Sequence, residues 1–557
     1  MSAPLQLWPP PKTLRRLPGQ LRPDTPAPEP VIDQRLPPEH YHLQAPADAA
    51  ASLRVADAAA ARHALATWRQ LMAHTPPPAL EIDDGPDFPI RGVMLDVSRC
   101  RVPTMDQLYA VVDGVAACKG NHLQLYVEHS VAYPGHQAVW ADASPLSLDE
   151  LAQLGAYAAT QGVELAANQN TFGHCERWLQ HPAYAHLGEL PDVAARLAAG
   201  EPGPFSLCPV DPRCRSLARD WLQQQMAVLP ATWVHVGCDE TVDVGQGRSA
   251  PAVQRRGLGP VWAEHCRAMC ETVLAAGRRP LFWADMALQH GQALERIPSQ
   301  AVAVAWHYEA DAPFARWAQA FAKQQRQWWV APGTSAWRSW LGRGDARDGS
   351  ITVAARDGLA AGASALLVCD WGDLGHRQPW PVSWYGLVQG LGAAWHAHAK
   401  MDHATIGRWA LGDAQAGVWL DACSRCDVTL RAQLQHPLRG GPLINASAPF
   451  VDSCLPWSRT DWASDPQPWQ ELRDYLQAQG PAPGNGPLAA ELNHAWLAVD
   501  TAAWRALARR GAASASGLSH TWQWLAQQHS AQWQQRCRPG GLPESLGYYS
   551  RLARESC

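Results

Sequence analysis

Two carboxylic acids stand side by side at the end of an apolar, alternating stretch of the sequence. They are Asp239 and Glu240 in TWVHVGCDETVDVGQGRS, Thr232–Ser249. Like charges close together in poor solvent raise each other's pKa, so this arrangement costs stability unless a function uses it. Neighbouring residues of a strand point to opposite faces, so the two acids can share a pocket only where the strand gives way to a loop.

Such a pair suits glycoside cleavage. A protonated carboxyl group donates a proton to the leaving oxygen beside a cationic sugar transition state. The structural alternative is that one acid caps the following helix and the other faces solvent. Tryptophan is abundant, with 28 Trp against 11 Tyr and 7 Phe. Indole rings stack on the C–H faces of sugars, but they also fill protein cores, so composition alone leaves both interpretations open.

The elements that must position these acids form a regular alternation over residues 90–400. Amphipathic helical stretches such as 104–120 and 147–162 separate the strands and end in Gly. Eight strand-then-helix units predict a closed (β/α)₈ TIM barrel of the α/β class. An open doubly wound sheet would favour a Gly-rich phosphate turn after its first strand, and RGVMLDVSR has none. The strands are expected to start at Arg91, His122, Val163, Trp233, Arg279, Val302, Trp328 and Ser364.

Polar residues fall where barrel chemistry is found, at the carboxyl ends of the strands. The longest connection, residues 171–211, follows the third strand and contains TFGHCERW, so we expect it to build or cover a site. Besides the acid pair, the polar residues at strand ends are Asp96, Arg99, Glu128, His129, Asn168, Asn170, Asp285, His307, Glu309, Asp370 and Asp373.

The remaining sequence predicts three further regions. Residues 1–40 are rich in Pro and indicate a loose lead-in. Residues 41–89 combine short strands with one helical stretch, which predicts a small α+β domain. Residues 401–557 carry apolar residues at helical spacing and predict a mainly helical region packed against the barrel, with a Pro/Gly-rich break near 480–487.

Composition excludes several functional classes. The 557 residues include 46 Lys and Arg against 51 Asp and Glu, with no basic block of the kind that tracks nucleic-acid phosphates. No stretch resembles a membrane span or a secretory leader, which predicts a cytoplasmic protein without membrane partners. The 14 Cys form no CxxC pair and no Cys/His cluster, which predicts reduced structural thiols and no metal site.

The motifs resemble one family. HVGCDET is similar to the His-x-Gly-x-Asp-Glu signature of glycoside hydrolase family 20, the β-N-acetylhexosaminidases. FPIRGVMLDVSR, NTFGHCE and FWADM resemble that family's first-strand, third-strand and fifth-strand motifs, in the expected order. The likeness covers residues 40–400, and WGDLGH and RPGGLPES suggest that it continues toward the C-terminus.

The resemblance implies a retaining exo-β-N-acetylhexosaminidase that needs no cofactor. In this class the 2-acetamido oxygen of a terminal β-linked GlcNAc or GalNAc attacks the anomeric carbon and forms an oxazolinium intermediate, an exception to the two-carboxylate rule. By position, Glu240 would be the general acid and then the base that activates water. Asp239 would hold the acetamido N–H, orient its oxygen and help to keep Glu240 protonated.

The resemblance also implies a set of substrate-binding residues. Arg91 would grip sugar hydroxyls with its bidentate fork, although a salt bridge at the barrel base is the alternative because Arg91 opens its strand. His174 would line the pocket near the acid, and Asp373 or Asp370 would bind the outer hydroxyls. The acetamido pocket would be walled by Trp283, Trp306 and Trp371, which as isolated Trp residues would otherwise be core.

The chain also departs from the family pattern. The Tyr that commonly contacts the acetamido oxygen is not evident near the seventh strand, where Trp337 and Trp340 stand, so Tyr308 is the expected substitute. Cys238 occupies a position that is often Gly, where we expect it to pack without a redox role. His235, Arg99 and Glu128 are expected to support the site from behind.

The expected partner is a glycan or glycoconjugate with a terminal N-acetylhexosamine, and a homodimer is compatible with the sequence. Two other functions stay open. Another acetamido-directed barrel hydrolase would share the chemistry, but the chain has neither a DxxDxDxE string nor an Asp-Asp pair. A non-catalytic carbohydrate-binding barrel predicts a lost acid, whereas Glu240 is present.

Overall fold

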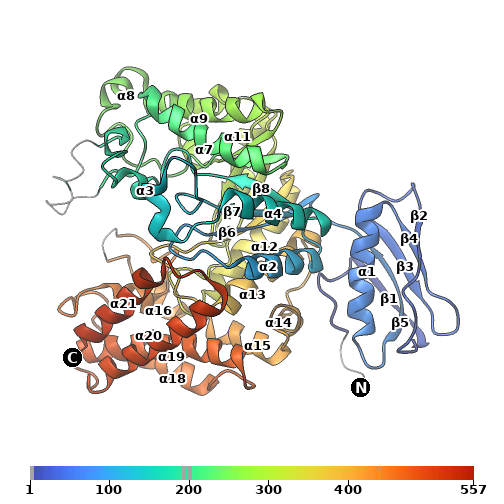
Figure 1. Cartoon of the computed structure of the whole chain (residues 1–557). Helices are drawn as coiled ribbons and strands as arrows, with labels where there is room; N and C mark the ends of the chain where they lie inside the picture. The colour runs from blue at the N-terminus through green and yellow to red at the C-terminus, as the bar shows by residue number, and fades with distance from the viewer. Residues whose placement is uncertain (1–4, 191–195, 197–202, 438–439, 557) are drawn as a thin grey trace.

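The computed structural model of the chain describes residues 5–190, 196, 203–437 and 440–556. It contains an N-terminal sheet domain, a central barrel and a C-terminal helical region (Figure 1).

The central barrel is closed, and all its strand pairs are parallel. Strand β13 pairs with β6 and completes the ring, with Ala365 opposite Ile90 and Asp370 opposite Leu95. This confirms the predicted (β/α)₈ barrel and its eight strand positions. The strands are β6 (Ile90–Asp96), β7 (His122–Tyr126), β8 (Glu164–Asn168), β9 (Trp233–His235), β10 (Arg279–Trp283), β11 (Val302–Trp306), β12 (Trp328–Ala331) and β13 (Ala365–Asp370).

Helices follow the strands and bury the barrel's outer face. Local signals start several of them: Ser147 and Glu150 form a capping box on α4, and Thr104 and Asp211 cap α2 and α7. The main helices are α2 (Met105–Ala117), α4 (Leu148–Thr160), α7 (Pro212–Val228), α9 (Leu258–Ala275), α11 (Phe314–Lys323), α12 (Gly344–Ala360) and α13 (Trp380–Trp395). Shorter ones are α3 (Gln137–Trp140), α5 (Glu176–Leu179), α8 (Ala250–Arg256) and α10 (Asp285–Gln289).

Aromatic side chains fill the barrel interior. The interior cluster includes Tyr126, Trp233, Trp283 and Trp329, all buried. Trp233 and Trp329 pack edge to face with ring centroids 4.9 Å apart. Much of the tryptophan therefore serves the core, as the structural interpretation of the composition expected.

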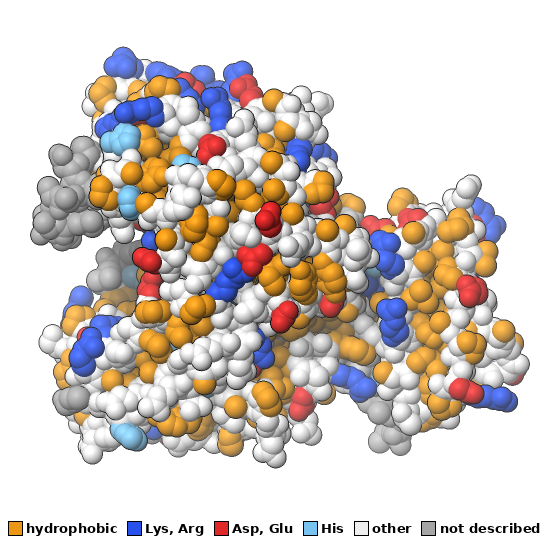
Figure 2. Space-filling view, in the orientation of Figure 1, with side chains coloured by type: hydrophobic (Ala, Val, Ile, Leu, Met, Phe, Trp, Pro, Cys, Tyr) orange, Lys and Arg blue, Asp and Glu red, His pale blue; other side chains and the backbone are white. Residues whose placement is uncertain are grey.

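The N-terminal domain is larger than the sequence indicated. Its five-stranded sheet has the order β1-β5-β3-β4-β2 and packs on α1 (Ala58–Met72). The predicted lead-in, residues 1–40, was wrong because it supplies β1 (Thr13–Gln20) and β2 (Pro30–Ile32), which join β3 (Tyr41–Ala45), β4 (Ser52–Val55) and β5 (Pro78–Asp84). Both added strands lie at sheet edges and are largely exposed, so they lack the apolar alternation that reveals a half-buried strand. Figure 2 shows the domain as a separate lobe at the right of the molecule.

The C-terminal region is helical and packs against the barrel, as predicted. Its connection after α20 reaches the loop that follows β6, where Arg538 N donates to Val102 O at 2.8 Å. The expected break near 480–487 falls between α18 and α19. The helices are α14 (His403–Leu411), α15 (Ala414–Cys423), α16 (Val428–Gln433), α17 (Ala448–Cys454), α18 (Gln467–Gln479), α19 (Pro487–Arg509), α20 (Leu518–Arg536) and α21 (Leu542–Glu555).

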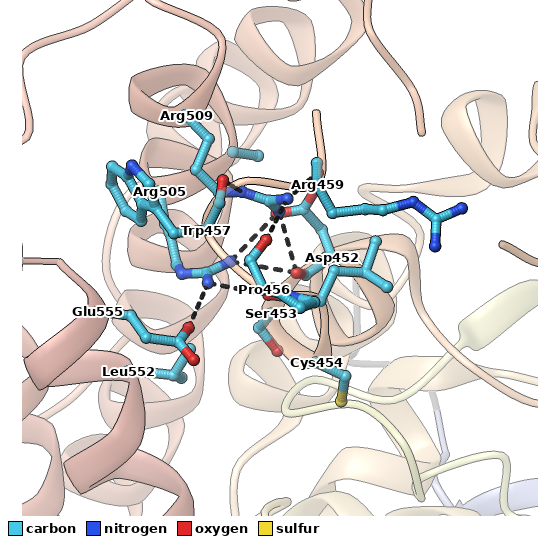
Figure 3. A network of polar contacts seen from close by, with 12 residues as sticks. Asp452, Ser453, Cys454, Pro456, Trp457, Arg459, Arg505, Arg509, Leu552 and Glu555 are labelled. Atoms are coloured by element: carbon cyan, nitrogen blue, oxygen red, sulfur yellow. Dashed lines mark hydrogen bonds and ion pairs between the residues drawn. The ribbon is translucent and has the colours of Figure 1, made fainter. Parts of the chain in front are cut away.

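A buried ionic cluster holds this region together (Figure 3). The Asp452 carboxylate is fully buried and lies 2.9 Å from Arg509, 3.0 Å from Arg510 and 3.6 Å from Arg505. Arg505 also pairs with Glu555 of α21 at 2.7 Å. Among the described helices, none combines the length and the apolar character needed to cross a membrane.

Candidate active site

The acid pair lies in a strained loop directly after β9. Gly237, Cys238 and Glu240 adopt left-handed backbone conformations with φ of +70°, +74° and +44°. Such values are uncommon for residues other than Gly and persist where the surroundings impose them. Two contacts do so here: Cys238 N donates to Asn170 Oδ1 at 3.3 Å, and Glu240 N donates to Asp285 Oδ2 at 3.0 Å. The loop thereby directs both carboxyl groups into one pocket.

Asp239 is the buried, anionic member of the pair. Its Oδ1 accepts a hydrogen bond from Asn170 Nδ2 at 2.8 Å, and its Oδ2 lies 3.1 Å from His174 Nε2. Burial raises the pKa of Asp239, but the charge and hydrogen bond of His174 and the amide of Asn170 outweigh it and lower that pKa. The carboxylate therefore stays charged.

Glu240 is the member of the pair whose pKa is raised. Its side chain is 50% exposed, and its Oε2 lies 3.6 Å from His174 Nε2. Partial burial and the charge of Asp239 raise the pKa of Glu240, against the lowering effect of His174. Two neighbouring carboxyl groups whose environments push their pKa values apart are the arrangement that acid–base catalysis uses.

His174 links the pair to a second charged layer. Burial lowers the pKa of His174, but the charge and hydrogen bond of Asp239 raise it to about 9. Arg99 Nη2 lies 3.1 Å from His174 Nδ1 and 3.0 Å from Glu128 Oε1. Burial raises the pKa of Glu128 to about 7, although Arg99 and His174 lower it. Two cationic side chains, His174 and Arg99, thus lie between the carboxylates of Asp239 and Glu128.

Aromatic rings form a wall beside the charged groups. Trp306 stacks on Tyr308 with ring centroids 5.3 Å apart, and Tyr308 meets Trp337 edge to face at 5.0 Å. The Tyr308 hydroxyl accepts a hydrogen bond from Trp371 Nε1 at 2.7 Å. That hydroxyl is fixed in place, as a group that recognises an amide oxygen needs to be.

One cavity of about 150 Å³ brings most of the predicted site residues together. Asp239, Glu240, His174, Trp306, Tyr308, Trp371 and Asp373 all line it, and Arg99, Trp337, Arg338 and Asn445 complete the lining.

A second cavity, of about 510 Å³, adjoins the first at Glu240 and Trp306. Its other lining residues include Val242, Asp285 and Trp317. Because Glu240 lies between the two cavities, a bond placed beside its carboxyl group could join a group in one cavity to a group in the other.

Arg91 does not reach the pocket, so its predicted role is wrong. It stands at the amino end of β6, is fully buried, and pairs through Nη2 with Glu39 of the N-terminal domain at 2.5 Å. Its Nε donates to Lys119 O at 2.8 Å. The contact with Glu39 is the salt bridge at the barrel base that the sequence allowed as the alternative to sugar binding. Arg99, which follows the same strand, instead brings a guanidinium group to the pocket.

Two other expectations are refined. Trp283 is fully buried, 4.4 Å from the His235 ring and 6.0 Å from the Trp371 ring by centroids, so it supports the pocket wall from behind and does not line the cavity. Between Asp370 and Asp373, only Asp373 lines the cavity. Asp370 is buried and accepts a hydrogen bond from Thr334 Oγ1 at 2.7 Å.

Sequence reasoning missed several pocket residues. Trp337 and Arg338 follow β12 and were detectable as polar or aromatic residues after a barrel strand. Asn445 comes from the C-terminal region, where no pattern marks it. His174, which the sequence did predict, comes from the long third connection, where it packs edge to face against Phe205 at 4.5 Å. Residues 191–195 and 197–202 of that connection lie outside the described residues.

Two groups of side chains in the described part of the chain have metal-ligand spacing. His174, Asp239 and Glu240 form one, and Asp348, His403 and Asp421 form the other. In each, arginine already supplies the positive charge: Arg99 contacts His174, and Arg347 lies 2.7 Å from Asp421. These carboxylates are therefore compensated by protein groups.

Comparisons with known proteins agree with this geometry. Residues 88–327 match the glycosyl hydrolase family 20 catalytic domain. Hexosaminidase D of Homo sapiens is 28% identical over 235 residues, 40% of this chain and 46% of that protein. The beta-hexosaminidase of Emericella nidulans is 24% identical over 275 residues, 44% of this chain and 45% of that protein. The chain thus spans about half the length of these curated relatives.

The fold likeness extends over the whole chain. The chitobiase of Flavobacterium johnsoniae superposes with a TM-score of 0.60 over 99% of both chains, at 14% identity. A closed (β/α)₈ barrel with an acid pair and an aromatic wall at one cavity is an arrangement that suits glycoside hydrolysis. Among glycoside hydrolases, the likeness over residues 88–327 is to the catalytic domain of glycoside hydrolase family 20.

Proposed function

We propose that the chain is a retaining exo-β-N-acetylhexosaminidase that removes terminal β-linked GlcNAc or GalNAc from glycans or glycoconjugates. The observation that carries the proposal is the split acid pair at the rim of one aromatic-walled cavity, where the pKa of Asp239 is lowered and the pKa of Glu240 is raised. The family match and the β-hexosaminidase names of the curated relatives support the same substrate class.

The first step is cleavage with help from the substrate. The acetamido oxygen of the bound sugar attacks the anomeric carbon, and the bond to the leaving oxygen breaks as Glu240 donates its proton to that oxygen. Asp239 accepts the acetamido N–H and offsets the positive charge that develops on the amide. His174 and Asn170 hold Asp239 in place for this role. The leaving group departs on the Glu240 side, where the cavity of about 510 Å³ can receive it.

The second step returns the enzyme to its starting state. Glu240, now a carboxylate, takes a proton from water, and the resulting hydroxide attacks the anomeric carbon of the oxazolinium ion. The ring opens, the acetamide is restored, and the sugar leaves with its original β configuration. Tyr308 and Arg99, fixed by Trp371 and Glu128, are the groups that orient the amide and the sugar during both steps.

Two measurements test the proposal together. The purified chain should release a chromophore from an aryl β-N-acetylglucosaminide, and nuclear magnetic resonance should show the β anomer as the first product. An aryl β-glucoside, which lacks the amide, should react far more slowly. Equal rates on the two glycosides would exclude substrate assistance. Sugar binding without turnover would favour the carbohydrate-binding alternative. The cytoplasmic location and the homodimer stay predictions.

A further inference from the structure

Five residues that line the cavity, Arg338 and Asn445 among them, lie outside the segment that matches the family. Arg338 follows β12, and Asn445 belongs to the C-terminal region, whereas the match covers residues 88–327. The C-terminal region therefore reaches into the same cavity as the acid pair.

Both residues are held in place before any sugar arrives. Arg338 and Asn445 have left-handed backbones, with φ of +47° and +56°. Such strain persists only where the surroundings impose it, and it gathers at ligand sites. The two segments are tied together, because Ser447 N donates to Arg338 O at 3.0 Å.

A second tie joins Asn445 to the barrel. Asn445 N donates to Glu309 Oε1 at 3.1 Å, and the same carboxylate oxygen lies 2.8 Å from Arg343 Nη1. Arg343 is fully buried, so this anchor is rigid. Both pocket side chains are therefore preorganised, which lowers the entropy cost of binding a ligand.

Their polar groups retain unused hydrogen-bonding capacity. Among the described residues, Asn445 Oδ1 and Arg338 Nε are buried without a hydrogen-bond partner. Arg338 Nη2 lies 3.3 Å from Asp373 Oδ2, which places the guanidinium beside the carboxylate expected to meet the outer hydroxyls. A buried polar group without a partner costs free energy that a ligand can recover.

The side chains of Arg338, Asn445 and Asp373 together suit a polyol ligand. An amide and a guanidinium donate, an amide oxygen and a carboxylate accept, and a sugar hydroxyl does both. The same lining holds Asp239, Glu240 and Tyr308, the groups suited to the acetamide and the anomeric centre. We infer that Arg338 and Asn445 bind the outer hydroxyl groups of the terminal sugar, so that the C-terminal region takes part in substrate recognition. This inference rests on the proposed function.

The test replaces Asn445 by Gly. Glycine adopts the left-handed backbone without strain, so Asn445→Gly deletes the amide and spares the loop. The matched control is Ile444→Ala, because Ile444 is the exposed neighbour in the same loop and does not line the cavity. The substrates are an aryl β-N-acetylglucosaminide and its monodeoxy analogues, each lacking one outer hydroxyl.

We expect Asn445→Gly to lower kcat/KM by roughly 3- to 10-fold, mainly through KM, as loss of one neutral hydrogen bond would. Arg338→Ala should lower it by roughly 10- to 100-fold, because its hydrogen bonds are charged. With the analogue that lacks the partner hydroxyl, the Asn445→Gly effect should vanish, and Ile444→Ala should match the wild type throughout. Equal kcat/KM for Asn445→Gly and wild type, or an equal loss on every analogue, would overturn the inference.

The same variants separate this inference from the proposed function. If the wild-type chain hydrolyses none of the glycosides, the proposed function fails, and calorimetric titration with N-acetylglucosamine decides the inference instead. Weaker binding by Asn445→Gly than by wild type and Ile444→Ala would support it. Equal binding by all three, or no binding to the wild type, would refute it. Unchanged thermal unfolding midpoints show that each variant is folded.

Discussion

Two charge clusters in this molecule have opposite balances of positive and negative side chains. In the C-terminal region, one carboxylate, Asp452, is surrounded by Arg505, Arg509 and Arg510 (Figure 3). In the barrel, the carboxyl groups of Glu128, Asp239 and Glu240 lie around two cationic side chains, Arg99 and His174, and Asp285 accepts a hydrogen bond from Glu240 N. The first cluster has more positive than negative groups, and the second has more negative than positive groups.

The difference distinguishes a cluster suited to stability from one suited to the proposed chemistry. The arginines around Asp452 also donate to backbone carbonyls, such as Trp457 O and Leu455 O, so most of their N–H groups are hydrogen-bonded, although Arg505 Nε is not. At the barrel, burial and the charge of Asp239 raise the pKa of Asp285 to about 7, and the pKa of Glu240 is also raised. These raised pKa values favour protonated carboxyl groups, and a protonated carboxyl group can transfer its proton to a substrate.

The largest expected effect is on turnover. Replacing Glu240 by Gln removes the transferable proton, so kcat/KM on substrates with poor leaving groups should fall by roughly 10²–10⁴, the range for lost acid–base help. The matched control is Glu264→Gln, a half-exposed acid on the surface of α9. Comparable rates for Glu240→Gln and wild type would show that Glu240 is not the general acid. The proposed contrast between a catalytic and a structural cluster would then fail.

Asp239→Asn should cost turnover more than binding. The charge of Asp239 matters most when the amide becomes positive in the transition state, so kcat should fall by roughly 10²–10³, the cost of losing one electrostatic contact. Binding of the product N-acetylglucosamine should change much less. Steady-state kinetics and calorimetry together measure the two quantities. A parallel loss of turnover and product affinity would assign Asp239 to ground-state binding instead.

The opposite outcome is expected at the C-terminal cluster. Asp452→Asn leaves three buried guanidinium groups with a weakened partner, which should lower the free energy of unfolding by about 3–5 kcal/mol. The kcat of the folded protein should stay unchanged. Chemical denaturation measures the first quantity and kinetics the second. The control Asp461→Asn removes an exposed partner of Arg459 and should leave the unfolding midpoint nearly unchanged. A stable Asp452→Asn variant would contradict the structural role of this cluster.

The sequence predicted the barrel well because its strands are buried and follow one another regularly. It missed β1, since an exposed edge strand of polar residues has no apolar alternation. For the site, adjacency in the chain revealed Asp239 and Glu240, and the strand-end rule favours Arg99 over Arg91, which opens its strand. Asn445 could not be predicted from the sequence, because only tertiary packing brings its loop in the C-terminal region to the cavity.

The smallest expected effect is a shift in pH dependence, and it tests how the barrel cluster works. Glu240 must be protonated to donate, so kcat/KM should decline as pH rises through its raised pKa. Since the charge of Asp239 helps to raise that pKa, Asp239→Asn should lower it and move the alkaline limb of the profile to lower pH.

Asp452→Asn offers the matched control, because Asp452 does not contribute to the Glu240 pKa and should leave the limb where it is. The profiles are compared as residual activities on one aryl glycoside, so the loss of turnover in Asp239→Asn does not affect the limb position. An alkaline limb at the same pH in Asp239→Asn and wild type would mean that burial alone holds the Glu240 proton. The charge of the neighbouring carboxylate would then not be what keeps Glu240 protonated.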